Sequence, residues 1–545
     1  MAYFSLFYEN QEQEYSAKKQ SEDQVYYRAK QKLEKRTYFI GARMVVSEEV
    51  SETGRNLPCF FQDLNLDTVF LPENDEFLTE ELKNYYFSFP EKLSEITYRQ
   101  DIYKDLDNPL VLQGLAAFRN DFTEAERLLE YRHKSDSPLQ QSKYYLDAAV
   151  LHYQSASRLY DILKEQVKSQ AFLSLFSHLT DFLHRDGYSD FYNRANRLKE
   201  QLENIRFTLT MAGNTVKVYF HENAGVTDDF GRNLEKVFRI KEHSRNSIRL
   251  FNQPGLNPFE SKLLSLVEKE YPKLRRECLE FASSDRPLTN DILQRLYKES
   301  EVYLSGHTLA AKLREKGFLM TYPEFKEMGS LHLEGICDIG LALTTGKRKD
   351  VAVNDLFLED GNRGAFITGV NQGGKTTYAR SVGQTAYLAM LGMPVIATRA
   401  LLPHFNGIHT HFTVEENHLV NNGKLQEELH HLKEILEKAP SNCLYVLNEM
   451  FSSTTAADAF DLTNLLLPKI FAKAGTVLCV THVPELAKLQ ADMISLIATA
   501  SEEDGYQRTY RIRPGEAALS ARAIDIALKY CLSGPQIKER IANGD

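Results

Sequence analysis

The chain has 545 residues and a formal net charge of −10, and its length exceeds what one compact core accommodates, so it predicts roughly three or four domains. Hydrophobic residues (43%) and charged residues (26%) occur in the proportions of an ordinary globular protein, which excludes a disordered or fibrous chain. The acidic balance argues against coating nucleic acid through overall charge, although it permits a local basic groove.

The cysteines and the apolar runs indicate the compartment. The six cysteines lie far apart, without the short Cys and His spacings of a zinc site, so we expect reduced thiols. No apolar run approaches the roughly 18 residues that cross a bilayer, and the N-terminus lacks the basic start and apolar core of a signal peptide. We therefore expect a cytoplasmic protein with no membrane partner.

Helical patterns dominate the first part of the chain. Residues 13–36 are charged and rich in Gln, with Tyr and Leu interleaved, which predicts an amphipathic helix in an N-terminal helical segment. Long helical phrases fill 57–202 and return from about residue 257, and they predict a helical domain. Between them, IRFTLTMAGNTVKVYF (205–220) alternates apolar and polar residues around an Ala-Gly-Asn turn, which predicts a β-hairpin.

The C-terminal part has a different pattern. From about residue 347, short β-branched strands alternate with helices, which is typical of a mostly parallel α/β sheet. We therefore expect an N-terminal helical segment, a helical domain in two parts, a β-rich insertion between those parts, and an α/β domain. In chain order the expected bounds are 1–56, 57–202, 203–256, 257–346 and 347–545.

The β-rich insertion carries cations that are candidates for DNA contact. Lys and Arg neutralise backbone phosphates without reading sequence, so they predict a phosphate-contacting tip. A solvated surface is the alternative, because acidic residues such as Asp228 and Glu235 lie among them. The candidate DNA contacts are Lys217, Arg232, Lys236, Arg239, Lys241, Arg245 and Arg249.

A phosphate-binding loop is the clearest motif of the α/β part. GVNQGGKT (369–376) fits the pattern G-x-x-x-x-G-K-[ST] in full, after a predicted strand and at the start of a predicted helix. In such a loop the backbone N–H groups surround a β-phosphate, Lys375 contacts the β and γ oxygens, and Thr376 offers its hydroxyl to Mg²⁺. A structural glycine-rich turn is the alternative.

Polar residues end two later strands. An apolar strand ends in Asn448-Glu449, at the place where a P-loop enzyme holds a carboxylate near Mg²⁺ and a second one that orients or deprotonates the attacking water. Glu449 is therefore the candidate base, and the neutral Asn448 predicts a weakened metal contact and slow hydrolysis. The next strand ends in Thr481-His482, which places an imidazole where it can sense the γ-phosphate, with a structural histidine as the alternative.

Together these motifs resemble those of the DNA mismatch-repair MutS family. TGVNQGGKT, with the helix and strand after it, is similar to the family's TGPNMGGKST segment, and VAVNDLFL to its FVPND-type adenine-side segment. Further on, HFTVEE resembles STFMVEM, NEMFSSTTAAD resembles DEIGRGTSTYD, and VTHVPEL resembles ATHYHEL. The resemblance implies a multidomain fold: a long-helix lever or core domain with a small β-rich, clamp-like insertion, followed by an α/β P-loop ATPase domain of the ABC type.

The resemblance also carries site residues onto this chain. It implies an ATPase that turns ATP and water into ADP and phosphate, with Lys375, Glu449 and His482 as catalytic residues and Thr376 and Asn448 as Mg²⁺ contacts. The expected ATP contacts are Gly369, Val370, Asn371, Gln372, Gly373, Gly374, Lys375, Thr376, Thr377 and, in place of the family's aromatic adenine stacker, Val351. At a face shared with a second subunit, the expected residues are Thr410, aligned with the family's signature Ser, and Ser452, Ser453 and Thr454.

For the whole chain, the resemblance implies a homodimer joined through the ATPase domain. ATP binding would move the helical arms by rigid-body rotation, so that the dimer acts as an ATP-gated clamp on mismatched, branched or otherwise unusual DNA in repair or recombination. Phe7-Tyr8-Glu9 spells the family's mismatch-reading Phe-x-Glu, but a charged helix follows directly, so we expect a MutS-like chain without the mismatch-recognition and connector domains. The alternative is an ATP-dependent switch that acts on a protein partner without binding DNA, which the acidic balance favours.

Overall fold

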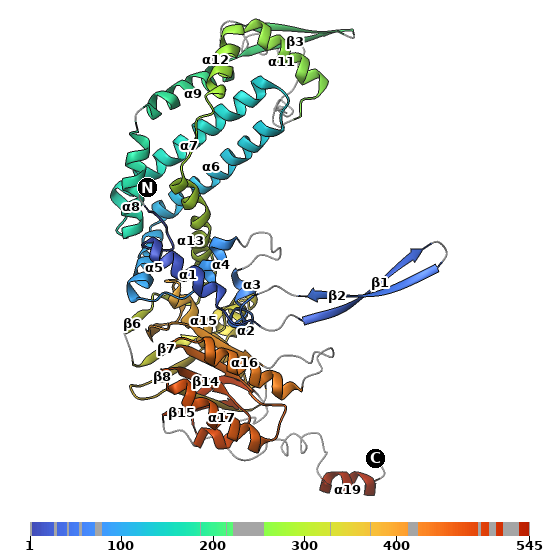
Figure 1. Cartoon of the computed structure of the whole chain (residues 1–545), viewed down its shortest axis with the longest axis vertical. Coiled ribbons are helices and arrows are strands. Elements are labelled where there is room, and N and C mark those ends of the chain that lie inside the picture. Colours follow the sequence, from blue (N-terminus) through green and yellow to red (C-terminus); the bar gives the residue numbers. More distant parts are fainter. Residues whose placement is uncertain are drawn as a thin grey trace. The chain divides into compact units, whose positions relative to one another are not determined.

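The computed structural model divides the chain into two compact units (Figure 1). One consists of Met1, Phe7–Tyr103 and Ser305–Asp545, and the other of Ala2–Leu6 and Lys104–Leu304. The five divisions expected from the sequence stay a prediction. The residues that the structure describes are 3–26, 30–40, 43–53, 57–70, 79–185, 187–213, 215–221, 255–326, 329–370, 372–412, 423–488, 492–500, 508–515 and 534–543.

Long helices build the unit that contains Lys104–Leu304. α6 (Pro109–Lys134) and α7 (Pro138–Gln166) lie side by side (Figure 1), and each begins with a proline in its first turn and a capping side chain, Asn108 or Ser137. The other helices are α8 (Gln170–Leu183), α9 (Tyr188–Glu203), α11 (Pro258–Glu270), α12 (Pro272–Ser283) and most of α13 (Asp291–Glu315). Buried side chains of α7, α9 and α12 form one core cluster. The helices expected over these residues are confirmed.

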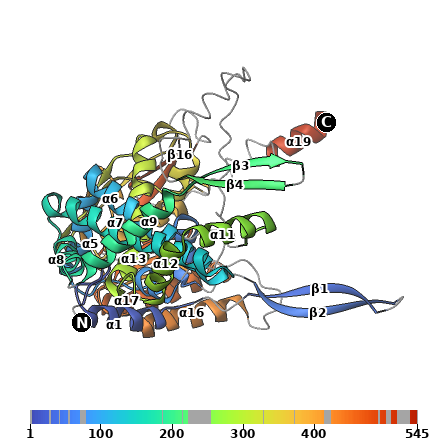
Figure 2. The same ribbon diagram turned by 90° about the horizontal axis from the view of Figure 1, so that it is seen from above.

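The expected hairpin is confirmed in the same unit. β3 (Arg206–Ala212) and β4 (Thr215–His221) pair in antiparallel register (Figure 2), and Gly213 in the turn has a φ of +59°, as a tight hairpin requires. Lys217 is exposed on β4. The other six candidate DNA contacts lie outside the described residues: Arg232, Lys236, Arg239, Lys241, Arg245 and Arg249.

A six-stranded sheet forms the centre of the other unit. Its strands stand in the order β12-β13-β14-β9-β15-β16, with the first five parallel and β16 antiparallel to β15. They are β9 (Gly364–Gly369), β12 (Ile408–Phe412), β13 (Leu444–Asn448), β14 (Thr476–Val480), β15 (Met493–Ala500) and β16 (Arg508–Pro514). The mostly parallel sheet expected from the sequence is therefore confirmed.

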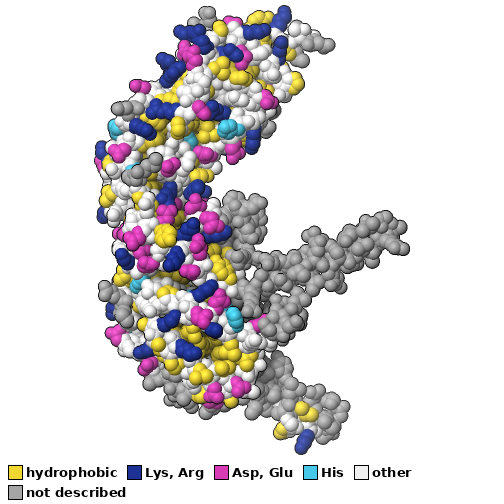
Figure 3. Space-filling model, viewed as in Figure 1, with side chains coloured by type: hydrophobic (Ala, Val, Ile, Leu, Met, Phe, Trp, Pro, Cys, Tyr) yellow, Lys and Arg dark blue, Asp and Glu magenta, His cyan; other side chains and the backbone are white. Residues whose placement is uncertain are grey.

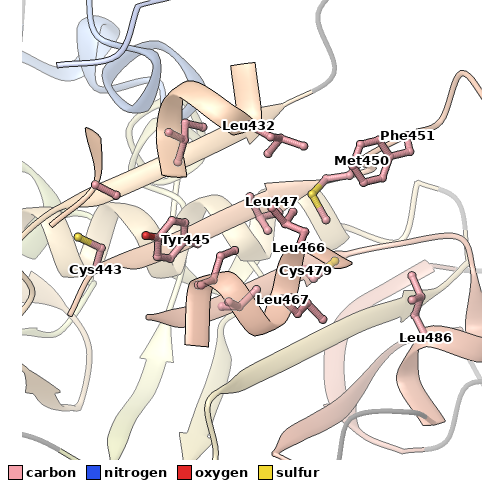
Figure 4. Close-up of a cluster of buried hydrophobic side chains, with 14 of the residues drawn as sticks. Leu432, Cys443, Tyr445, Leu447, Met450, Phe451, Leu466, Leu467, Cys479 and Leu486 are labelled. Atoms are coloured by element: carbon pink, nitrogen blue, oxygen red, sulfur yellow. The ribbon is translucent and has the colours of Figure 1, made fainter. Parts of the chain in front are cut away.

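Helices connect these strands and bury the sheet. They are α15 (Lys375–Met390), α16 (Lys424–Lys438) and α17 (Ala456–Phe471), and a short 3₁₀ helix (Pro484–Lys488) follows β14. Buried side chains of α16, α17, β13 and β14 form one cluster, and Figure 4 shows part of it, including Tyr445, Leu447 and Leu467. Because all five residues of β13 are buried, Asn448 at the end of the strand and Glu449 directly after it are held at a fixed place.

A second, mixed sheet of four strands was not expected from the sequence. Its order is β6-β11-β7-β8, and two further short strands, β5 and β10, pair with each other. The bounds are β5 (Met320–Thr321), β6 (Glu324–Lys326), β7 (Leu331–Ile336), β8 (Asn354–Leu358), β10 (Val395–Ile396) and β11 (Arg399–Pro403), with α14 (Ile339–Thr344) after β7. β8 brings the segment that follows Val351 into this sheet.

The N-terminal part of this unit differs from the prediction. α1 spans Gln11–Glu22 and is capped by Asn10, and β1 (Lys30–Ile40) then pairs with β2 (Arg43–Thr53). The helix expected over 13–36 is therefore wrong beyond Glu22. The many Lys and Glu residues of β1 and β2 favour helix, but the β-branched and aromatic residues of the same two segments favour paired strands. The helices α2 (Cys59–Asp63), α3 (Leu66–Phe70), α4 (Glu80–Tyr86) and α5 (Leu93–Leu106) follow.

The loop between α2 and α3 lies directly against α15. Arg380 Nε donates to the carbonyl oxygen of Asp63 (3.1 Å), and Gln384 Nε2 donates to that of Leu64 (2.8 Å). A Cβ atom on Gly383 would lie 2.6 Å from Leu64 Cδ2, so glycine permits this close approach. Every helix in the described part of the chain is too short or too polar to cross a lipid bilayer.

Candidate functional site

Three glycines shape the loop between β9 and α15. Gly369 and Gly374 have φ angles of +111° and +87°. A Cβ atom on Gly373 would lie 2.9 Å from the carbonyl oxygen of Val370 and 3.0 Å from Ala498 Cβ on β15. The chain therefore turns tightly into α15, whose first N–H groups have no partner within the helix and favour an anion. Asn371 lies outside the described residues.

Lys375, the first residue of α15, is buried within this loop. Its Nζ donates to the carbonyl oxygens of Gly369 and Val370, both at 3.2 Å. Burial lowers the pKa of Lys375, and the positive charge of Arg508 acts in the same direction, whereas Glu449 opposes it. An anion bound beside Lys375 would offset the positive charges of Lys375 and Arg508. The other expected ATP contacts that the structure describes in this segment are Gln372, Thr376 and Thr377.

Thr376 and Asn448 come together at the end of β13. The Thr376 hydroxyl donates to Asn448 Oδ1 at 2.9 Å, and Asn448 is 8% exposed. A hydroxyl and an amide oxygen suit Mg²⁺ held chiefly by phosphates and water, because Mg²⁺ prefers oxygen ligands. Within the described part of the chain, His, Cys, Asp and Glu form no group of three or more that could hold a metal by themselves.

Glu449 and His482 form a short hydrogen bond. Glu449 Oε1 lies 2.7 Å from His482 Nε2. The bond to His482 lowers the pKa of Glu449, burial opposes this, and the charge of Lys375 adds to it, so Glu449 is ionised near neutral pH. Glu449 also has a φ of +54°, a conformation that costs a non-glycine residue about 1–3 kcal/mol. Its N–H donates to the Val480 carbonyl oxygen at 2.9 Å, which helps to hold it.

The residues expected at a shared face have different surroundings. Ser452 and Ser453 are exposed, and the Thr454 hydroxyl donates to Asp458 Oδ2 at 2.9 Å, in the first turn of α17. Thr410, in contrast, is 1% exposed in β12, and its hydroxyl donates to Asp63 Oδ2 at 2.6 Å. The contact that the Thr410 hydroxyl makes is therefore internal to the chain.

Near Val351, the residue expected beside adenine, the structure places residues that were not expected from the sequence. Val351 is buried, whereas Tyr510 of β16 is exposed, and its Cδ1 would lie 3.5 Å from a Cβ atom on Gly374. Asn354 fixes this arrangement, because its Nδ2 donates to the Tyr510 carbonyl oxygen (3.1 Å) and its Oδ1 accepts from the Ile512 N–H (2.8 Å). An exposed aromatic between two arginines in RTYR was the only available sequence signal. Only the structure shows that β16 pairs with β15 and so brings Tyr510 close to Gly374.

Comparison with known proteins agrees with this geometry. Residues 365–529 match the family model described as MutS domain V. The chain is 27% identical over 263 residues to the DNA mismatch repair protein MutS of Thermotoga neapolitana, which is 47% of this chain and 32% of that protein. It is 26% identical over 312 residues to that of Thermotoga petrophila (56% and 38%), and 31% identical over 161 residues to that of Natronomonas pharaonis (29% and 19%).

The matched region thus spans well under half the length of these relatives. The family-model match, residues 365–529, includes the P-loop, the Asn448-Glu449 pair and His482, and the structure brings these residues together. Through this match and the motifs that carry it, residues 365–529 are identified as a MutS domain V, and the chain is similar to MutS proteins over part of its length.

Proposed function

We propose that the chain binds ATP with Mg²⁺ and hydrolyses it slowly, and that this activity serves DNA mismatch repair or a related repair process. One observation carries the proposal. The Thr376–Asn448 hydrogen bond (2.9 Å) and the Glu449–His482 hydrogen bond (2.7 Å) lie at the ends of two neighbouring parallel strands, β13 and β14, beside the buried Lys375. If Lys375, Glu449 and His482 only formed a cluster of ion pairs, the close-packed glycine loop around Lys375 would have no role.

Phosphate binding follows from the loop and from α15. The N–H groups of 369–374 and the helix N-terminus would contact the β-phosphate, and Lys375 would turn from the two carbonyl oxygens to the phosphate oxygens. Thr376 and Asn448 would hold Mg²⁺, which neutralises charge on the β and γ oxygens when bound. Tyr510 would contact the base, because it is the exposed aromatic ring beside Gly374.

Hydrolysis needs a group that takes a proton from water. Glu449 is ionised and fixed by His482, so it can act as general base, and the His482 imidazole can report the γ-phosphate to β14. Asn448 presents a neutral oxygen where a carboxylate would hold the metal more firmly. We therefore expect turnover that is slow but present.

We further propose a homodimer that closes on DNA. The proposal is supported by the similarity to DNA mismatch repair proteins and by the hairpin of β3 and β4, on which Lys217 is exposed. On the face in Figure 3, Lys and Arg side chains are interspersed with Asp and Glu, so a groove for DNA on this face would be local. The exposed Ser452 and Ser453 would face the second subunit.

The test is ATP hydrolysis by the full chain, alone and with matched duplex, mismatched duplex, four-way junction and single-stranded DNA. We expect slow Mg²⁺-dependent hydrolysis and salt-sensitive binding to at least one of these DNAs. Absence of hydrolysis under all conditions contradicts the proposal that the chain is an ATPase. Hydrolysis without binding to any DNA, with or without ATP, contradicts the clamp and favours an ATP-dependent switch that acts on a protein partner.

A further inference from the structure

α16 carries a carboxylate on its apolar face. Glu428 is 6% exposed and lies one turn before Leu432 (Figure 4) and two turns before Ile435, and both of these residues are buried in the hydrophobic cluster of α16, α17, β13 and β14. Glu428 Oε2 accepts the backbone N–H of Phe451 at 3.0 Å. Among the described residues this is the one hydrogen bond of the carboxylate, because Oε1 has none. A buried carboxylate needs a reason to be there.

The residue that Glu428 holds belongs to the loop that follows the candidate base. Glu449 and Phe451 both have left-handed backbones, with φ angles of +54° and +59°, although neither is a glycine. Such conformations persist only where the surroundings hold them. Each has its own restraint: the Glu449 N–H donates to Val480 on β14, and the Phe451 N–H donates to Glu428 on α16.

Side-chain packing alone does not account for this arrangement. Phe451 is 1% exposed and Met450 is buried beside it, so apolar contacts hold their side chains (Figure 4). A packed ring still leaves its backbone N–H to be satisfied, and here the partner comes from another helix. The Thr454 N–H donates to the Phe451 carbonyl oxygen (3.1 Å), so both backbone groups of Phe451 are bonded.

We propose that Glu428 is a positioning residue for ATP hydrolysis: by holding the Phe451 N–H, it fixes the left-handed turn that directs Glu449 toward the attacking water. The inference rests on the proposed function. Glu428 acts through the backbone, without contact to the nucleotide. Since misplacement of a catalytic group by about 1 Å can cost roughly 100-fold in rate, a single backbone bond can set the turnover number.

Three variants of the full chain separate this role from a contribution to stability. Glu428→Ala removes the acceptor, and Glu428→Gln keeps an oxygen that can accept the Phe451 N–H. Glu437→Ala is the matched control, because Glu437 is an exposed glutamate on the same helix, paired with Lys433. We expect Glu428→Ala to lower kcat about tenfold or more with the Kd for ATP within about twofold, Glu428→Gln to keep about half of kcat, and Glu437→Ala to be unchanged.

Amide hydrogen exchange of 449–455 gives a readout that does not depend on activity. Exchange should be faster in Glu428→Ala than in the parent chain, and close to the parent rate in Glu428→Gln and Glu437→Ala. The inference is overturned if Glu428→Ala keeps the parent kcat, or if it loses ATP binding and thermal stability along with kcat and Glu428→Gln restores none of them. A parent chain that hydrolyses no ATP contradicts the proposed function itself, whereas active parent and Glu428→Ala chains with equal rates contradict only the role of Glu428.

Discussion

The carboxylate of Glu449 and the imidazole of His482 share a 2.7 Å hydrogen bond across the ends of β13 and β14. The bond keeps Glu449 ionised despite its partial burial. It also joins two strands that lie side by side in the parallel sheet. A change at either strand end therefore alters the group at the other.

Glu449→Gln should stop turnover without releasing ATP. The amide cannot accept a proton from water, so kcat should fall roughly 100-fold or more, which is the usual size of a general-base contribution. The Kd for ATP, measured by equilibrium binding, should change little. Glu485→Gln, an exposed glutamate just after β14, is the control. Hydrolysis at the parent rate in Glu449→Gln would exclude this residue as the base.

Asn448→Asp should keep or raise the rate of hydrolysis. A carboxylate adds a negative charge at the oxygen that accepts the Thr376 hydroxyl, and Mg²⁺ prefers charged oxygen ligands. We expect up to about a tenfold rise in kcat, together with a lower Mg²⁺ concentration at half-maximal rate. Titration of Mg²⁺ at saturating ATP measures both. A fall in kcat with unchanged folding would show that the site needs the neutral amide.

Tyr510→Ala should weaken ATP binding. Stacking of a base on an aromatic ring contributes about 1–3 kcal/mol, so we expect the Kd for ATP to rise roughly tenfold. Tyr510→Phe keeps the ring and should bind like the parent chain. The effect on binding of inorganic triphosphate, which has no base, should be small. If triphosphate binding falls as much as ATP binding, Tyr510 acts by supporting the P-loop.

Glu299 predicts a pH dependence of stability in the unit that contains Lys104–Leu304. Burial raises the pKa of Glu299 from 4.5 to about 7, against the ion pair with Arg295 (2.9 Å) and the hydrogen bonds from Ser5 and Leu6. Because the folded state holds the proton more tightly than the unfolded state, this contribution to stability is full below pH 4.5 and is lost as pH rises through 7. The melting temperature of the parent chain should therefore fall by a few degrees more than that of Glu299→Gln over this range. Parallel curves for the two chains would contradict the assignment.

The sequence predicts the candidate site better than the rest of the fold. The P-loop, Asn448-Glu449 and Thr481-His482 each follow a short apolar strand, and the ends of adjacent parallel strands meet at one edge of a sheet. Their proximity is therefore implied by the motifs. The hairpin of β3 and β4 was equally predictable, because the turn and both strands are local in sequence.

Long-range contacts were not predictable from one sequence. Glu428 reads as one more polar residue of an amphipathic helix, and nothing in its neighbourhood indicates that it meets the Phe451 backbone. Tyr510 reaches Gly374 only because β16 returns antiparallel beside β15. The helix expected over 13–36 is wrong from Lys30 onward, because the pairing of β1 with β2 outweighs the helix-favouring charged residues there.

The contact of α15 with Asp63 and Leu64 determines where the chain can be cut. A fragment that starts at residue 347 would contain every residue of the family match, yet it would lose the carbonyl partners of Arg380 and Gln384, which lie more than 300 positions earlier. It would also lose the carboxylate that Thr410 bonds and the cover of Gly383. We therefore expect the smallest piece of this chain that folds with α15 intact to be discontinuous and to include residues 57–66, joined or supplied in trans.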